Sequence, residues 1–184
     1  EFDDHGHVCR IPALVGECDK PSRRAVRYPV REQQGFVWVW AAPDVPPEVE
    51  PYTFPWADDA EHTTVRYRLE AQASLHQVAE NALDVPHTAF LHGGLFRTDK
   101  ADRNRITCKL TRSHLTAECE YVGEPRPEGL IGRILSPSGG MVTHFDRFHL
   151  PGTIEVEYRI GTENHLVSAA ALTPAEDHRT IVWA

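Results

Sequence analysis

A proline-rich stretch divides this sequence. Five prolines fall between Pro43 and Pro55, and acidic residues separate several of them. Proline lacks a backbone N–H and fixes φ, so such a stretch cannot continue a helix or a sheet ladder. We expect residues 43–61 to form a linker along the surface. It would join a small unit of residues 1–42 to a larger domain of residues 62–184.

Short strand signals and turns dominate the segment before the linker. Residues 35–40 read Gly-Phe-Val-Trp-Val-Trp, a β-branched and aromatic run. Such a run is typical of a strand that is buried on both faces, or of one that closes a small sheet. Residues 1–7 contain no initiator Met and no apolar signal region, so we interpret them as the middle of a longer chain.

The segment after the linker has the pattern of a separate α+β domain. Residues 64–69 alternate with period two, as expected of a half-buried strand. Ser74 and Gln77 have the spacing of a capping box, and apolar residues recur at helical spacing from Leu75 to Leu83. Further strands are expected at 106–110, 115–121, 141–150, 153–160, 165–172 and 180–183. One prominent helix with antiparallel strands predicts an α+β fold.

The cysteines test the expected strand pairing. The chain has four, Cys9, Cys18, Cys108 and Cys119, too few for a disulfide scaffold. If Ser113-His114 is a two-residue turn, Cys108 lies directly opposite Cys119 on the inward face. In a reducing cytoplasm we expect both thiols to be free, buried and slow to react with alkylating reagents.

Charge and hydropathy exclude two classes of function. A net charge of -8 argues against a nucleic-acid partner, which requires clustered positive charge. No run of about 18 apolar residues appears, so we expect no membrane span and a cytoplasmic protein. Four arginines, Arg23, Arg24, Arg27 and Arg31, form a basic cluster. They are either a docking patch for an acidic electron-transfer partner or, as the simpler interpretation, a solvated strand face.

The candidate chemistry lies in one segment at the end of the predicted helix. His87 and His92 are five residues apart, Asp84 precedes them, and Asn81 lies one helical turn before Asp84. A regular helix separates positions i and i+5 by roughly 140°, so both imidazoles reach one ion only if the helix widens or breaks at Val85-Pro86. Imidazole suits iron, zinc and copper alike. On spacing alone, the alternative is two ordinary polar side chains.

The motif Asn81-x-x-Asp84-x-x-His87-x4-His92 resembles the mononuclear-iron motif of the alpha subunits of Rieske-type non-haem iron oxygenases. A second likeness lies upstream, where residues 2–12 and 28–40 resemble the final part of a Rieske domain. The resemblance covers most of the chain in the family's order. It implies a helix-grip (START-like) antiparallel sheet around a long helix. The C-terminal strands of an all-β Rieske domain would precede it.

The resemblance also implies a reaction scheme. Electrons from NAD(P)H would pass through a separate reductase or ferredoxin to a [2Fe-2S] cluster, and then to a mononuclear Fe(II) that activates O2. His87 and His92 would be two ligands of a facial triad. Asp84 would link the iron to the cluster of a neighbouring subunit in a homotrimer or related ring, and Asn81 would line the same site.

The substrate implied for the full-length parent is an apolar, ring-containing small molecule, which the enzyme would hydroxylate or demethylate. Four apolar residues near the proposed iron are candidate walls of its pocket, or simply core: Phe90, Leu91, Leu95 and Phe96.

The sequence departs from the family at both ends. The C-x-H and C-x-x-H pairs that bind the cluster do not occur, and we expect the third, acidic iron ligand to lie beyond Trp183. Asp146 fits a paired strand residue and Asp177 a turn, so neither is assigned as a ligand. We therefore expect this fragment alone to be inactive.

Two other classes of function stay open. One is a helix-grip module that binds a small molecule without redox activity. The other is a zinc hydrolase, disfavoured because no Glu follows His87 as in H-E-x-x-H.

Overall fold

The computed structural model describes residues 1–16, 23–85, 87, 107–123, 142–161 and 164–184. The chain divides into two compact units, residues 1–62 and residues 63–184. The assignment of residues 1–42 to a Rieske domain and of 43–61 to a linker stays a prediction.

The first unit is built on a hairpin. Strands β1 (Val30–Gln33) and β2 (Phe36–Val39) pair antiparallel, with Gln33 opposite Phe36. The two turn residues both have positive φ, 51° at Gln34 and 76° at Gly35, as a tight two-residue hairpin turn requires. Glycine at the second position adopts this conformation without steric cost.

Of the two interpretations of residues 35–40, a strand buried on both faces is wrong, and the structure has instead a strand of a small, two-stranded sheet. Val37 and Val39 are 65% and 58% exposed, whereas Phe36 and Trp38 on the other face are half-buried. The physical reason is that a two-stranded sheet has only one packed face here. That face packs on Phe54, whose ring centroid lies 5.4 Å from that of Phe36.

The proline-rich segment is fastened to this hairpin by a glutamine. The side chain of Gln34 donates to the carbonyl oxygen of Phe54 at 2.9 Å and accepts from its N–H at 2.7 Å. Phe54 is buried, and its ring also contacts Trp38 and Tyr52. The segment therefore packs along the hairpin at this point, within the first unit.

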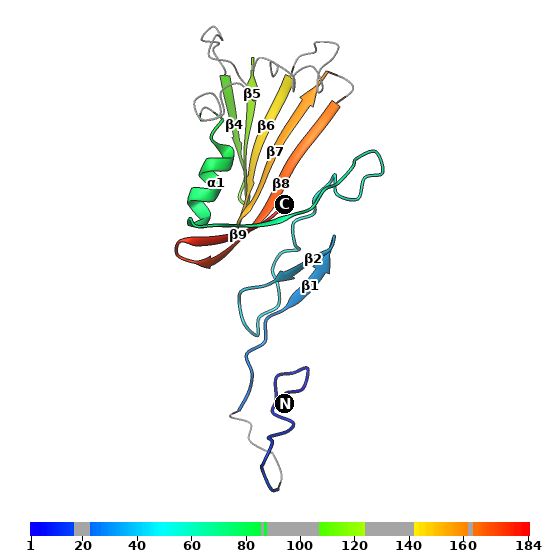
Figure 1. The fold of residues 1–184 in the computed structure, drawn as a ribbon, viewed down its shortest axis with the longest axis vertical. Coiled ribbons are helices and arrows are strands. Elements are labelled where there is room, and N and C mark those ends of the chain that lie inside the picture. The colour runs from blue at the N-terminus through cyan, green and yellow to red at the C-terminus, as the bar shows by residue number, and fades with distance from the viewer. Residues whose placement is uncertain (17–22, 86, 88–106, 124–141, 162–163) are drawn as a thin grey trace. The chain divides into compact units, whose positions relative to one another are not determined.

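The second unit is a seven-stranded antiparallel sheet with one short helix (Figure 1). Its strand order is β3-β9-β8-β7-β6-β5-β4. The bounds are β3 Arg68–Ala71, β4 Thr107–Arg112, β5 Thr116–Val122, β6 Val142–His149, β7 Thr153–Ile160, β8 Asn164–Glu176 and β9 Arg179–Trp183. The predicted antiparallel α+β fold is confirmed. The described residues do not include the long helix that was expected, because helix α1 (Leu75–Leu83) has nine residues.

Helix α1 begins and ends where local chemistry directs it. The predicted capping box is present, since Gln77 N–H donates to Ser74 Oγ and Ser74 N–H donates to Gln77 Oε1. Thr180 of β9 donates its hydroxyl to the Ala73 carbonyl at 2.9 Å, which ties the start of the helix to the sheet. The helix ends at Leu83, because Asp84 leaves helical geometry ahead of a proline.

The core lies between α1 and one face of the sheet. Its buried members are Ala79 of the helix and Ile154, Ala170, Leu172 and Val182 of the strands, with Leu75, Val78, Leu83 and Phe148 packed around them. Burial of these side chains contributes on the order of 1.5–3 kcal/mol for each large aliphatic residue. The apolar residues whose helical spacing predicted α1 therefore form the face of the helix that packs on the sheet.

The register expected for β4 and β5 is wrong by two residues. Cys108 pairs with Tyr121 and Leu110 with Cys119, because the turn centres on His114-Leu115 instead of on Ser113-His114. Ser113 holds this loop, with its backbone N–H donating to the Thr116 carbonyl and its hydroxyl accepting from the Thr116 N–H.

The expectation of two free, buried thiols is also not met. Cys108 and Cys119 form a disulfide with Cα atoms 5.9 Å apart, and Cys108 is exposed. Because a shift of two residues keeps every side chain on its face, the two cysteines become diagonal neighbours instead of direct partners.

None of the helical residues described here forms a segment long and apolar enough to cross a bilayer.

Candidate functional site

The end of α1 brings two of the predicted site residues together. Asp84 is the C-cap, with φ -86° and ψ 83°, and the His87 N–H donates to its carbonyl oxygen at 3.3 Å. This turn places Nδ1 of His87 3.9 Å from Oδ2 of Asp84. The His87 side chain is 18% exposed and the Asp84 side chain 53% exposed, so the imidazole is the more enclosed partner.

Asn81 and Asp84 line one hollow beside the helix. Its volume is about 710 Å³, and Phe148 of β6 lies across from the helix. The other lining residues are His76, Gln77, Ala79, Glu80 and Leu83. Asn81 and Asp84 thus border the same hollow, and Asn81 is exposed, but its predicted place in an iron site stays a prediction.

His92 and the candidate pocket walls, Phe90, Leu91, Leu95 and Phe96, lie outside the described residues. Whether both imidazoles face one cavity therefore stays a prediction. Within the described ranges, no three His, Cys, Asp or Glu side chains gather closely enough to hold a metal ion.

The donors that the structure describes in this segment are one imidazole and one nearby carboxylate, which are too few by themselves to hold a metal ion. A histidine that binds a metal through Nε2 usually donates a hydrogen bond from Nδ1 to a carboxylate or a carbonyl. The 3.9 Å between Nδ1 of His87 and Oδ2 of Asp84 is too long for that bond. Imidazole nitrogen is a suitable ligand for iron and zinc, and the assignment of His87 as a ligand stays a prediction.

Sequence reasoning missed a second polar group, His144 with Asp146. Both lie on the face of β6 that is turned toward α1, and both are buried, with 0% and 4% of their side chains exposed. Nε2 of His144 and Oδ1 of Asp146 are 2.8 Å apart. The sequence did contain a signal, because His144 and Asp146 share the parity of Val142 and Phe148, which marks the inward face. As expected, Asp146 is a paired strand residue.

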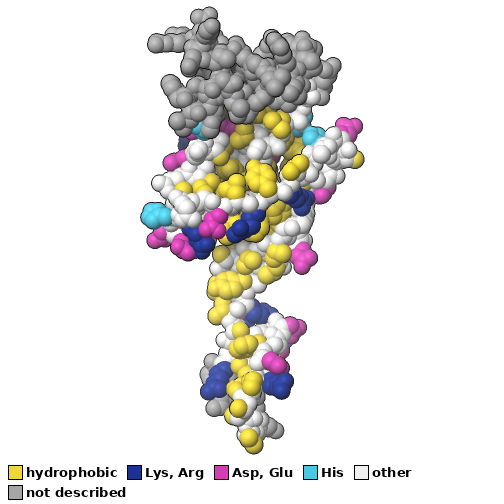
Figure 2. Space-filling model, viewed as in Figure 1, with side chains coloured by type: hydrophobic (Ala, Val, Ile, Leu, Met, Phe, Trp, Pro, Cys, Tyr) yellow, Lys and Arg dark blue, Asp and Glu magenta, His cyan; other side chains and the backbone are white. Residues whose placement is uncertain are grey.

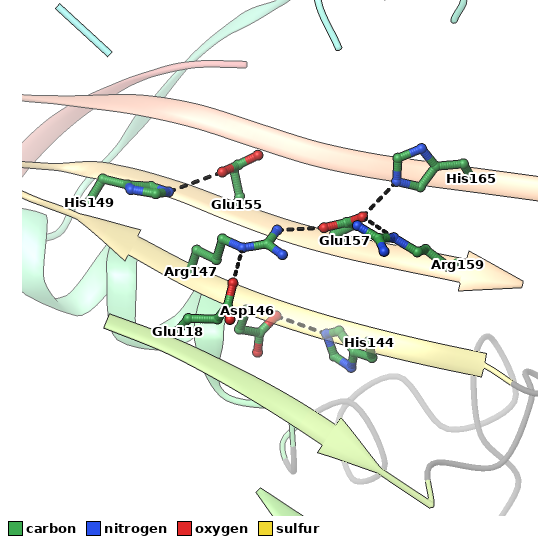
Figure 3. A network of polar contacts seen from close by, with 9 residues as sticks. All are labelled: Glu118, His144, Asp146, Arg147, His149, Glu155, Glu157, Arg159 and His165. Carbon is green, nitrogen blue, oxygen red and sulfur yellow. Dashed lines mark hydrogen bonds and ion pairs between the residues drawn. The ribbon is translucent and has the colours of Figure 1, made fainter. Parts of the chain in front are cut away.

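The opposite face of the sheet carries a different polar network (Figure 3). Glu157 is fully buried and accepts hydrogen bonds from Arg147, Arg159 and His165. Burial opposes the ionisation of Glu157, but these three donors outweigh it and hold its pKa below the ordinary value. For Arg147 the effect of burial is likewise outweighed, by hydrogen bonds to Glu157 and Glu118, so its pKa is raised. The charged side chains of this network therefore pair with one another.

The arginine cluster of the first unit is largely paired. Arg24 and Arg27 both contact Asp44, and Arg31 contacts Glu50. Figure 2 shows basic and acidic side chains interspersed on the face in view, with no large area of one sign. This arrangement favours the solvated-face interpretation of the cluster over a docking patch.

Comparison with known proteins gives one match to a family. Residues 71–184, more than half of the chain, match the family described as "Vanillate O-demethylase oxygenase C-terminal domain".

Two curated relatives resemble nearly the whole chain. Protein TIC 55, chloroplastic, of Pisum sativum is 29% identical over 170 residues, which is 89% of this chain and 28% of that protein. The protein of the same name from Arabidopsis thaliana is 29% identical over 176 residues, or 90% of this chain and 30% of that protein. The chain thus spans less than a third of these relatives.

Solved structures share the fold. The crystal structure of dicamba monooxygenase bound to dicamba aligns over 99% of this chain and 55% of its own, with a TM-score of 0.77 and 17% identity. The structure of Pseudomonas putida CBB5 NdmA with caffeine aligns over 99% and 51%, with a TM-score of 0.75 and 21% identity. The chain therefore covers about half of each of these proteins.

Proposed function

The chain belongs to the vanillate O-demethylase oxygenase C-terminal domain family of the Rieske-type oxygenases, and on this premise we propose that its parent activates O2 at a mononuclear Fe(II). The activity proposed is hydroxylation or demethylation of an apolar, ring-containing substrate. Residues 62–184 would supply most of the catalytic domain, residues 1–42 the tail of the Rieske domain, and residues 43–61 the linker.

The observation that carries the proposal is the contact between Asp84 and His87 at the end of α1. A carboxylate beside Nδ1 favours a proton on that nitrogen, which leaves Nε2 as the lone-pair donor to a metal. We assign His87 and His92 as iron ligands. Iron bound there would supply the chemistry that activates O2 next to the substrate.

The roles proposed for Asp84 and Asn81 follow from their positions. The Asp84 carboxylate orients the His87 ring and, being 53% exposed, is available to a second group outside the helix. We propose that this group belongs to a neighbouring subunit of a homotrimer or related ring, whose [2Fe-2S] cluster supplies the electrons. Asn81 lines the same hollow and would contact the substrate or its water.

The lining of the hollow beside α1 is suited to a small, apolar substrate. Ala79, Leu83 and Phe148 give it an apolar wall, and the helix contributes polar groups along the rim. The two similar structures hold ring compounds, dicamba in one and caffeine in the other. The electron source proposed for the parent is NAD(P)H, acting through a ferredoxin or a separate reductase.

Metal analysis of the anaerobically purified full-length parent tests this function. Iron in excess of the two atoms that a [2Fe-2S] cluster contains supports the proposal. Absence of any metal would favour a small-molecule-binding module of the same fold, and zinc in place of iron would favour a hydrolase. Either of these two outcomes contradicts the proposal.

A further inference from the structure

A buried carboxylate on the helix-facing side of the sheet has an unused oxygen. Oδ1 of Asp146 lies 2.8 Å from Nε2 of His144, but no described residue donates a hydrogen bond to its buried Oδ2. An ionised carboxylate has about four acceptor positions and no donor. A buried acceptor without a partner costs roughly 1–3 kcal/mol, so folded proteins rarely keep one without a reason.

Register places this oxygen on the side of the proposed site. Phe148 pairs with Ile154, which packs against α1 in the core, so this row of residues faces the helix. Asp146 is two residues before Phe148 on the same strand and therefore shares its face. Since Phe148 lines the hollow beside α1, Asp146 is the next residue of β6 on that same face. Figure 1 shows α1 lying beside the sheet, with the end of the helix part-way along the strands.

The aromatic rings around His144 determine which oxygen of Asp146 the imidazole contacts. His144 is fully buried, and its ring stacks with the rings of Tyr121 and Tyr158, at centroid distances of 4.7 and 4.1 Å. These three rings form one row across β5, β6 and β7. Packing on both sides keeps the imidazole in one plane, with Nε2 directed at Oδ1. Oδ2 is the oxygen of Asp146 that stays buried without a hydrogen-bond donor.

The opposite face supplies a comparison within the same sheet. Glu155 is as buried as Asp146, at 4% side-chain exposure, and also contacts a histidine, with Nε2 of His149 3.0 Å from its Oε2. Glu157 uses both oxygens, one for Arg147 and the other for Arg159 and His165. Among the buried side-chain atoms that the structure describes, Oδ2 of Asp146 is a carboxylate oxygen without a donor, and Figure 3 shows only the other oxygen of Asp146 joined to His144.

We propose that Asp146, positioned by His144, determines specificity by accepting a hydrogen bond from an O–H or N–H group on the ring-containing substrate. The proposal rests on the function proposed above and narrows its substrate class. A negatively charged acceptor selects a neutral or cationic donor and disfavours an anionic group at that end of the substrate. A site built to bind a donor also rejects the isostere that lacks it, because the acceptor is then left buried and unpaired.

Binding of isosteric ligands to the metal-free chain tests the proposal. Phenol and toluene differ by a hydroxyl in place of a methyl group, and indole and indene by an N–H in place of a methylene. Saturation-transfer NMR or calorimetry gives the ratio of the two Kd values within each pair. We expect the donor of each pair to bind at least about tenfold more tightly, although an apolar hollow by itself favours toluene and indene.

Two variants test whether Asp146 causes the preference for ligands that carry a hydrogen-bond donor. Asp146→Asn keeps the shape but presents an amide, and we expect it to bring each ratio within about threefold of unity or to invert it. Glu155→Gln makes the same change in the equally buried carboxylate of the other face, and we expect it to leave both ratios unchanged. Because each ratio is measured within one protein, a general loss of stability cancels.

Three outcomes overturn the proposal. They are equal or reversed affinities in the unmutated chain, no binding of any of the four compounds, and a preference that persists in Asp146→Asn. The first two outcomes are measured in the unmutated chain, so the proposal can be tested even if a variant fails to fold. The measurement is made without iron, so its failure leaves the iron proposal standing. Failure of the metal analysis would likewise leave a donor preference intact.

Discussion

Oδ2 of Asp84 lies 3.9 Å from Nδ1 of His87, at the residue where α1 ends. This distance is too long for a hydrogen bond but short enough for an electrostatic preference. We propose that the pair acts as a metal ligand and its supporting acid, and the first prediction tests this role.

Asp84→Asn in the full-length parent should retain iron but lose turnover by at least about tenfold. The amide keeps the shape of the side chain but removes the charge that links His87 to a second group. Iron content and turnover with an artificial electron donor are the measurements. Asp177→Asn, the same chemical change at an exposed turn residue of the second unit, is the control. Equal activity in Asp84→Asn would make Asp84 an ordinary surface acid.

Glu157→Gln should lower the free energy of unfolding by at least about 2 kcal/mol at pH 7, because it leaves the largely enclosed Arg147 guanidinium without its fully buried carboxylate partner. The pKa of Glu157 is held below its ordinary value of 4.5 in the folded protein. Its contribution is therefore present above pH 4.5 and lost as pH falls through the lower, folded-state pKa. Urea unfolding of both proteins at pH 7 and near pH 3 measures the difference.

The control for this pH dependence is Glu120→Gln. Glu120 pairs with the exposed Lys109 on the same face of the sheet, so its removal should cost less than about 1 kcal/mol. A gap between Glu157→Gln and the unmutated protein that stays constant from pH 7 to pH 3 would contradict the account of the network.

Without reductant, the folded chain should show two fewer reactive thiols than after reduction and unfolding. The structure joins Cys108 to Cys119, and their Cα separation of 5.9 Å is ordinary for a disulfide. Mass spectrometry after alkylation, with and without reductant, counts the thiols. Labelling of Cys108 and Cys119 in the unreduced protein would restore the expectation of two free thiols.

Ser74→Ala should destabilise the second unit by about 0.5–2 kcal/mol, because it removes the oxygen that accepts from the Gln77 N–H. Thermal unfolding of the chain measures the loss. Ser168→Ala, a change at an exposed strand serine, is the control and should stay within about 0.5 kcal/mol. Equal effects of the two changes would mean that the cap does not stabilise α1.

Local rules explain what could be predicted from the sequence. The capping box at Ser74 and the end of the helix near Asp84 depend on residues a few positions apart, so the sequence contains their cause. Alternation also placed Cys108 and Cys119 on one face correctly. Pairing is different, because the position of the turn sets the register. The Ser113 hydroxyl accepts a hydrogen bond from the Thr116 N–H, and the turn centres on His114-Leu115, one residue later than expected.

The polar group at Asp146 could not be predicted for a related reason. Alternation indicates that His144 and Asp146 face inward, but not which oxygen stays unused once His144 has turned toward the other. That depends on the stacking of Tyr121 and Tyr158, which belong to neighbouring strands. The assignment of His92 as a ligand lies outside the described residues and stays a prediction that depends on the family motif.

Electron paramagnetic resonance of the nitric oxide adduct of Fe(II) tests the central claim most directly. In the anaerobically reduced full-length parent we predict a nitrosyl signal from mononuclear iron beside the signal of the [2Fe-2S] cluster. His87→Ala and His92→Ala should each abolish the nitrosyl signal and keep the cluster signal. His114→Ala, an exposed histidine of the β4–β5 loop, should keep both. An undiminished nitrosyl signal in His87→Ala would contradict the assignment of this segment as the iron site.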